Sequence, residues 1–160
     1  MAVDMFLKVE GADGESQDDS HAGEIDILAY SFGASNRGTA HIGGGAGAGK
    51  VSVQDLSVTK YVDKSTPNLI LFCANGKHVP ECLLTVRKSG ESPLEYIKLT
   101  LTDCLITAVS AGGSQGEDRL TENVTINFAE FKYEYTPQKP DGSGDAPVTI
   151  GWNVAKNVKV

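Results

Sequence analysis

Long apolar runs, paired cysteines and clusters of bases are all missing from this chain of 160 residues. No apolar run approaches the ~20 residues of a membrane span, and the segment from Met1 to Glu10 alternates and carries charge, unlike the apolar core of a signal peptide. The three cysteines, Cys73, Cys82 and Cys104, are odd in number and lack CxxC spacing. We therefore predict buried reduced thiols, without a disulfide framework or a zinc site.

Basic residues are outnumbered, with 14 Lys and Arg against 21 Asp and Glu, for a net charge of −7. The segment from Val9 to Asn36 holds seven acids and no Lys or Arg, and the rest of the chain is balanced. Nucleic acids and anionic membranes are bound by clustered Lys and Arg. The sequence therefore excludes both as expected partners, and it places the whole net charge in one stretch.

Alternation of apolar and polar residues predicts strands along most of the chain. The apolar phase slips at Ile27/Leu28, which predicts a bulge or a bend, and it slips again between Phe128 and Phe131. We expect strands over residues 2–10, 24–33, 51–62, 81–88, 94–110, 121–136 and 148–154. In the fifth of these, Leu101 and Leu105 are predicted to share one phase. Long strands joined by Gly- and Pro-containing turns favour an all-β barrel or sandwich.

One short helix interrupts this β pattern. Ser65 or Thr66 can cap its N-terminus, Pro67 suits the first helical position, and Asn75-Gly76 suits its end. These signals predict a helix of about ten residues. The chain length fits one domain over residues 1–160 with a substantial core.

A glycine-rich segment over residues 35–50 nearly spells a phosphate-binding loop. Gly44-x-x-x-x-Gly49-Lys50 matches, but Val51 stands where Ser or Thr is needed, and a strand pattern follows instead of a helix. We therefore expect no nucleotide there. The segment is long for a connection inside a compact domain, so it is either disordered or functional.

The three histidines share no metal-ligand or catalytic spacing. His21, His41 and His78 fall on loops or element ends, so we predict surface or capping roles for them. We predict no nucleophile elbow either, because the GxSxG string at Gly112–Gly116 falls in a predicted loop and not in a strand-to-helix turn. We predict no enzyme, no catalytic residue, no metal and no cofactor.

Several blocks along nearly the whole chain resemble the haemolysin-coregulated protein (Hcp) family, the inner-tube proteins of the bacterial type VI secretion system. The most specific are Asp63-Lys-Ser-Thr-Pro67 and Glu117-Asp-Arg-Leu-Thr-Glu122. The others are Gly14-Glu-Ser16 with His21, Glu24–Gly33, Gly43–Lys50, Val53–Asp63, Gly76-Lys-His78, Arg87–Gly90 and Asn123–Phe128.

The resemblance implies an all-β fold, a two-sheet β-barrel with one short α-helix on its side, that forms hexameric rings. Such rings stack into a tube inside a contractile sheath with its baseplate, capped by a VgrG-type spike. The tube is expelled into a target cell, which links the family to virulence. The rings can hold and protect small effector proteins in their lumen. The protein would be made in the bacterial cytoplasm and secreted without a cleaved signal peptide.

Under this reading several residues become interface candidates. The glycine segment could order itself against the next subunit or ring, the turn after Arg87 lies on a ring face by resemblance, and the end of the chain carries bases without acids. An acidic stretch and a basic end could therefore meet across stacked rings. The candidates are Gly43, Gly44, Gly45, Gly47, Gly49, Lys50, Lys88, Gly90, Glu91, Lys156, Asn157 and Lys159. Ser31, between Tyr30 and Phe32, would face opposite to those aromatics and is a candidate for the lumen and cargo.

Two other classes compete with the structural ring. One is a monomeric β-barrel module that binds a small ligand. The other is an enzyme, although 160 residues leave no room for a toxin domain beside the barrel.

Overall fold

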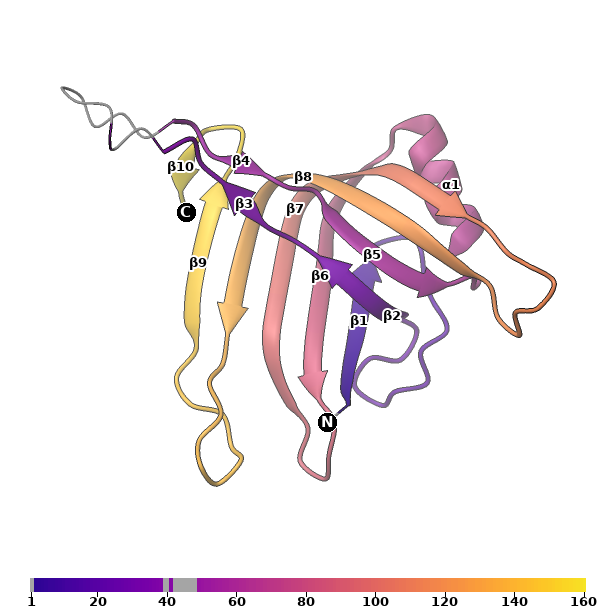
Figure 1. Cartoon of the computed structure of the whole chain (residues 1–160), viewed down its shortest axis with the longest axis horizontal. Helices are drawn as coiled ribbons and strands as arrows, with labels where there is room; N and C mark the ends of the chain where they lie inside the picture. Colours follow the sequence, from indigo (N-terminus) through magenta and orange to yellow (C-terminus); the bar gives the residue numbers. More distant parts are fainter. Residues whose placement is uncertain (1, 39–40, 42–48) are drawn as a thin grey trace.

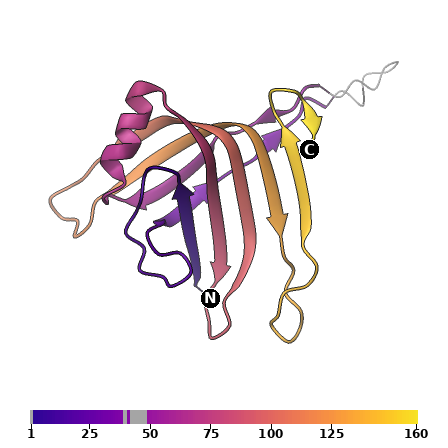
Figure 2. The ribbon, with the colours of Figure 1, turned by 180° about the vertical axis from the view of Figure 1, so that it is seen from behind.

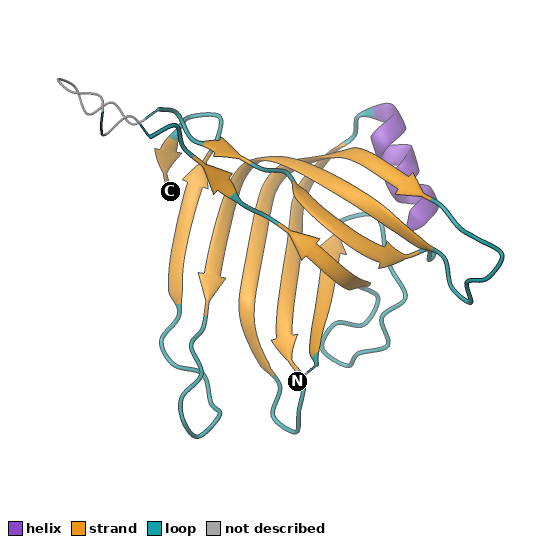
Figure 3. Ribbon diagram, viewed as in Figure 1, coloured by secondary structure: helices purple, strands orange, loops and turns teal. Residues whose placement is uncertain are grey.

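The computed structural model describes residues 2–38, 41 and 49–160, and these residues form a mainly β structure with one short helix (Figure 1, Figure 3). Among them, no helix is both long and apolar enough to cross a membrane. The elements in order are β1 Val3–Val9, β2 Ile25–Ser31, β3 Ala34–Ser35, β4 Ser52–Val53, β5 Leu56–Tyr61, α1 Thr66–Asn75, β6 His78–Lys88, β7 Leu94–Ala111, β8 Thr121–Tyr135, β9 Val148–Asn153 and β10 Val158–Lys159.

Six antiparallel strands close on themselves in the order β8-β5-β2-β1-β6-β7, because β7 also pairs with β8. Closure leaves these strands without a free edge inside the barrel. The strands β9 and β10 extend the sheet beyond β8, and β3 and β4 form a separate two-stranded ribbon. The barrel with one helix on its side confirms the predicted fold class.

Strand β8 has two different neighbours along one edge. Its first half pairs with β5, with Leu56 opposite Ile126, and its second half pairs with β9, with Phe131 opposite Trp152. Along its other edge β8 pairs with β7 almost throughout. The second half of β8 therefore leaves the barrel and continues into an open wall with β9 (Figure 1).

The buried face of β7 and β8 changes phase where this wall begins. In β7 both Leu101 and Cys104 are buried, and in β8 both Phe128 and Phe131 are buried. Asp103 lies between the two β7 residues in a left-handed conformation with φ 54°. The phase slip predicted in β8 is confirmed. The single apolar phase predicted for β7 from Leu101 to Leu105 is wrong, because the left-handed backbone at Asp103 shifts the buried face of the strand.

Apolar side chains from the six barrel strands and α1 fill the interior. Leu7, Ile25, Leu56, Leu84 and Leu99 have no exposed surface. The helix packs on β7 and contributes Leu69 and Phe72 to the same cluster. Burial is also confirmed for Cys82 and Cys104, whereas Cys73 is half-buried.

The helix begins and ends at the predicted residues, but no side chain caps its N-terminus, because the Ser65 hydroxyl donates to Asp63 and the Thr66 hydroxyl to Glu122. Pro67 lies in its first turn, and Gly76 follows its last residue with φ 64° and ψ 30°, a left-handed conformation that glycine adopts without strain. The predicted irregularity at Leu28 is confirmed as a register shift between Ile27 and Ala29 against β5. The single strand predicted over residues 51–62 is wrong, since it divides into β4 and β5.

Candidate functional site

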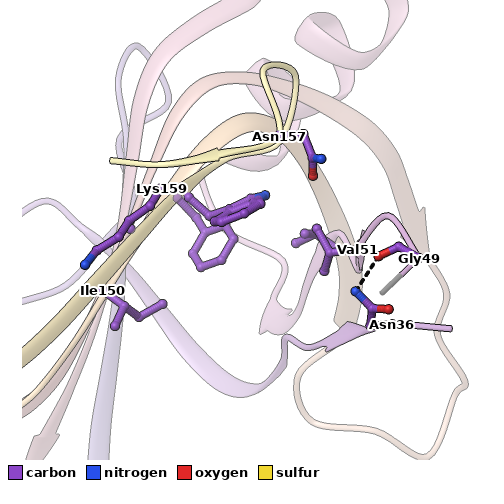
Figure 4. A pocket seen from close by; sticks show the side chains of 10 residues that line it. Asn36, Gly49, Val51, Ile150, Asn157 and Lys159 are labelled. Carbon is purple, nitrogen blue, oxygen red and sulfur yellow. Dashed lines mark hydrogen bonds between the residues drawn. The ribbon is translucent and has the colours of Figure 1, made fainter. Parts of the chain in front are cut away.

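An apolar groove of about 560 Å³ lies outside the barrel, between the last two strands and the start of β4. Segments far apart in the sequence meet there, because Asn36 and Gly49 contribute from one side and Asn157 and Lys159 from the other (Figure 4). The remaining lining residues are mostly apolar: Val51, Val53, Phe131, Ile150, Gly151 and Trp152.

Polar groups at the groove are only partly satisfied within the subunit. The Asn36 side-chain amide donates to the Gly49 carbonyl at 2.7 Å, a contact drawn in Figure 4. The Trp152 Nε1 is buried and has no hydrogen-bond partner among the described residues. A buried indole N–H normally has an acceptor. The groove thus has an apolar floor, and one of its lining residues holds a buried donor without a partner.

Three predicted interface residues, Gly49, Asn157 and Lys159, lie together in this groove. Lys50 and Lys156 are exposed, and they directly adjoin Gly49 and Asn157 in the sequence. We call these five residues the tail end of the subunit. The predicted positions Gly43, Gly44, Gly45 and Gly47 lie outside the described residues.

The other predicted interface residues, Lys88, Gly90 and Glu91, lie at the opposite end of the barrel, in the turn between β6 and β7 (Figure 1). The Lys88 ammonium donates to the Gln138 side chain at 3.0 Å. A cleft of about 410 Å³ separates this turn from the loop before β9. We call the 88–93 turn and this loop, residues 137–147, the turn end.

Exposed apolar side chains lie on two opposite flanks. On one flank Val148 and Ile150 of β9 are 64 % and 52 % exposed, and Val158 and Val160 beside them are also exposed. On the other flank lies α1, which has no charged residue and exposes Ile70 and Leu71. Figure 1 and Figure 2 both place β9 and β10 across the barrel from α1. Single exposed apolar residues are common on protein surfaces, whereas groups of them, as on these two flanks, mark contact surfaces.

Sequence patterning missed the apolar flank on β9. Its outward residues, Val148 and Ile150, alternate with Thr149 and Gly151, which is the pattern of any half-buried strand. The alternation places Val148 and Ile150 on the same face as Trp152, and it does not show that this face is left uncovered at one end.

Ser31 is exposed at the end of β2, whereas Tyr30 and Phe32 pack partly against the core. The opposite orientation predicted for Ser31 is therefore confirmed. Its contact with a lumen cargo stays a prediction.

The acidic stretch is partly neutralised by the barrel itself. Arg87 of β6 binds Asp18 through both terminal nitrogens, at 2.9 and 2.7 Å, and reaches Asp4 at 3.1 Å. The hydrogen bond to Arg87 is the main reason why the pKa of Asp18 lies below its usual range, although some burial opposes the shift. Asp18 and its guanidinium partner therefore form a fixed pair that is not free to meet another ring.

The surface or capping role predicted for the His21 side chain is wrong, because that side chain is buried between two glutamates. His78 is exposed and pairs with Asp103 at 2.8 Å, and His41 is exposed as well. Within the described part of the chain, no group of three His, Cys, Asp or Glu side chains is arranged to hold a metal.

Comparison with known proteins identifies similar chains over the full length. A model of the family described as "Type VI secretion system effector, Hcp" matches residues 6–135. Protein hcp1 of Pseudomonas aeruginosa is 58 % identical, and the match covers 99 % of each chain. The crystal structure of Hcp1 from Salmonella typhimurium has a TM-score of 0.80 at 36 % identity, covering 100 % of both chains. A structure described as a type six secretion system protein has a TM-score of 0.93 at 28 % identity, covering 99 % of this chain and 100 % of the other.

Proposed function

Since this chain belongs to the Hcp family of type VI secretion proteins, we propose that six copies of it close into a ring and that the rings stack into the inner tube. The observation that carries this proposal is the pair of apolar flanks. They are different surfaces on opposite sides of one subunit, β9 and β10 on one and α1 on the other. A contact between two different surfaces is head-to-tail, and it closes into a ring when the rotation per subunit closes.

The wall formed where β8 leaves the barrel supports the same arrangement. The strands β7, β8 and β9 run side by side beyond the barrel. The two-residue strand β10 pairs only with Trp152 and Asn153, so the rest of β9 lies at the open edge of this wall. In a ring, the next subunit covers this edge, so the walls of six subunits surround a lumen. Ser31 is our candidate for contact with small effector proteins held in that lumen.

Stacking uses the two ends of the subunit. The tail end carries Lys156 and Lys159, and it includes no acidic side chain. The turn end carries three acids, Glu91, Asp141 and Asp145, against two bases, Lys88 and Lys139, so its net charge is −1. Because the ends differ in charge, rings stacked in one direction bring opposite charges together. The tail end of one ring would therefore meet the turn end of the next.

The remaining partners follow from the family. The tube would run inside the contractile sheath, rest on baseplate proteins and carry a VgrG-type spike at its tip. The protein would be made in the cytoplasm and exported by the type VI system without a cleaved signal peptide. Its work would be mechanical and protective, with no catalysis, cofactor, nucleic acid or membrane insertion, and all 160 residues would act as one domain.

Native mass spectrometry tests ring closure directly. We expect a species of six times the 16.9 kDa subunit mass, and negative-stain images showing rings. Ile150→Asp and Leu71→Asp each place a carboxylate on one flank. Each should break the six-subunit species into single subunits, because ring closure would bury an unpaired carboxylate, which is strongly unfavourable. Val3→Asp, which charges an exposed apolar residue off both flanks, should leave the ring intact. A single-subunit mass for the unmodified protein at high concentration would refute the proposal.

The alternative, a monomeric module that binds a small ligand, is favoured by one feature, the apolar groove whose lining includes Trp152. The barrel interior does not favour it, since Leu7, Leu56 and Leu99 fill that interior completely. The same mass measurement separates the two functions, because the alternative requires a stable single subunit.

A further inference from the structure

His21 is held between two carboxylates where the acidic loop, residues 11–24, meets the barrel. Its Nδ1 lies 2.9 Å from Glu24 Oε2 and its Nε2 lies 2.5 Å from Glu95 Oε1. The ring stacks on Phe6 with centroids 4.4 Å apart and planes at 10°, and only 8 % of the residue is exposed. Glu24 belongs to the loop and Glu95 to β7, so the imidazole joins the loop to the barrel.

The two contacts require a particular protonation state. An ionised carboxylate can only accept hydrogen bonds, and a neutral imidazole carries a single N–H. Both contacts are hydrogen bonds only when the ring is an imidazolium. Burial alone lowers the pKa of His21, but the hydrogen bonds to Glu24 and Glu95 together outweigh it, so the pKa lies above its usual value.

We propose that His21 is a proton-dependent latch, which fastens the tip of the acidic loop to β7 while the imidazole is protonated and releases it when the ring is neutral. This inference concerns the single subunit and does not depend on the tube.

Charged groups on the neighbouring elements are fixed in pairs. Arg87 of β6 binds Asp18 of the loop and Asp4 of β1. Lys98 of β7 lies 3.5 Å from the second oxygen of Glu95. Carboxylates, Lys and Arg ordinarily keep their charge between about pH 6 and 9, whereas histidine changes charge near that interval. His21 is therefore the proton-sensitive member of the cluster.

The backbone of the loop limits what can move. Gly14 N donates to Gly23 O at 2.9 Å, and Ser16 N and Glu24 O are 3.0 Å apart, so the base of the loop is closed like a small hairpin. Ala12 and Ser16 are buried in this base. Arg87 also holds Asp18 to β6. The segment free to detach is therefore the part of the tip beyond Asp18, residues 19–22.

The sign of the pH effect follows from the raised pKa. Docking of the tip is fully stabilised below the unfolded value of about 6.5, and this stabilisation is lost as pH rises through the higher pKa of the folded state. The latch is thus closed in acid and opens toward alkaline pH.

Hydrogen exchange read by mass spectrometry, together with NMR of histidine labelled with ¹⁵N, tests the latch. Across pH 6–9, after correction for intrinsic exchange rates, we expect peptides over the tip to lose protection as His21 titrates above about 6.5. His78→Gln changes the exposed histidine that pairs with Asp103. It should change neither the protection of the tip nor the titration of His21 as functions of pH. A wild-type His21 that titrates at or below about 6.5, or tip protection that does not vary with pH, would overturn the proposal.

Two variants separate a latch from a merely structural histidine. His21→Gln should leave the tip poorly protected at every pH. Glu95→Gln should lower the His21 pKa yet keep the tip docked to higher pH, because the new amide can donate to neutral Nε2 while Nδ1–H still donates to Glu24. Protection that decays with pH in Glu95→Gln as it does in the wild type would contradict the latch.

The latch adjoins the turn end, since Glu95 follows the 88–93 turn directly. If rings stack through this end, as proposed above, stacking should be firmer when His21 is protonated. The exchange and NMR measurements report on the loop within each subunit, so their failure would leave the tube proposal intact, and a failed ring would leave the latch intact.

Discussion

Lys60 of β5 and Glu122 of β8 lie opposite each other on neighbouring strands and form a hydrogen-bonded ion pair. Neither side chain has any exposed surface. The Lys60 ammonium also lies 3.0 Å from Asp63 Oδ1 and donates to the Tyr61 carbonyl at 2.9 Å. The Thr66 hydroxyl, at the first residue of α1, donates to the same Glu122 oxygen at 2.7 Å. The pair therefore joins two barrel strands to the start of the helix.

Removing Lys60 alone should destabilise the fold severely. Lys60→Met leaves the Glu122 carboxylate buried with only Thr66 as a donor, and breaking a buried pair costs about 3–5 kcal/mol. Glu122→Gln should cost less, because Asp63 still pairs with the ammonium. Urea unfolding at one fixed protein concentration measures both, since ring formation makes stability depend on concentration.

The double variant Lys60→Met with Glu122→Leu is the matched control for that prediction. An apolar pair of similar volume is often as stable as a buried ion pair, so the double variant should recover most of the loss. If the double variant were as unstable as Lys60→Met, the loss would come from packing and not from the unpaired carboxylate.

The glycine that ends α1 should be replaceable only by a residue that tolerates a left-handed backbone. Gly76 has φ 64°, and a Cβ added there meets no atom within 4 Å, so any loss comes from the backbone and not from a clash. We expect Gly76→Ala to cost about 1 kcal/mol and Gly76→Asn less. Gly112→Ala, at a glycine with equally open space and without a positive φ, should be near neutral in the same urea experiment.

The barrel strands and the helix could be predicted from the sequence because their signals are local. Alternation shows one buried face, and Ser65, Pro67 and Gly76 mark the ends of the helix. The phase change in β7 could not be predicted, since Asp103 adopts its left-handed conformation through the pairing of β7 with β8 and not through any nearby glycine.

The candidate site was predictable only in part for a related reason. Charge and the family resemblance indicated Gly49, Asn157 and Lys159 separately, but only the fold places all three in one groove. The burial of His21 had no local signal either, because its partner Glu95 is 74 residues away in the sequence. Contacts between distant segments depend on strand register, which single-sequence patterns do not define.

Charge at the tail end should control stacking and make it sensitive to salt. Lys156→Glu reverses one charge of the tail end outside β9 and β10, and we expect it to weaken tube formation by purified rings while leaving single rings intact. The unmodified protein should form fewer tubes at 1 M salt, where the Debye length falls to about 3 Å. Lys8→Glu makes the same charge change on β1, away from both ends, and should stack normally. Electron microscopy of tube length measures the effect, and unchanged tubes at high salt would exclude this interface.

Deleting residues 43–49 should leave a folded barrel that assembles poorly. This segment falls between β3 and β4 in the chain, where Ala34 pairs with Val53, and none of the closed barrel strands includes it. The β-type circular dichroism spectrum and the urea midpoint of the single subunit should therefore change little. Tube formation should fall, because the deletion removes the glycine segment together with Gly49 from the groove. Replacing the segment with serines of equal length separates the need for glycine from the need for length. Loss of the circular dichroism spectrum in the deletion variant would show instead that this segment supports the barrel itself.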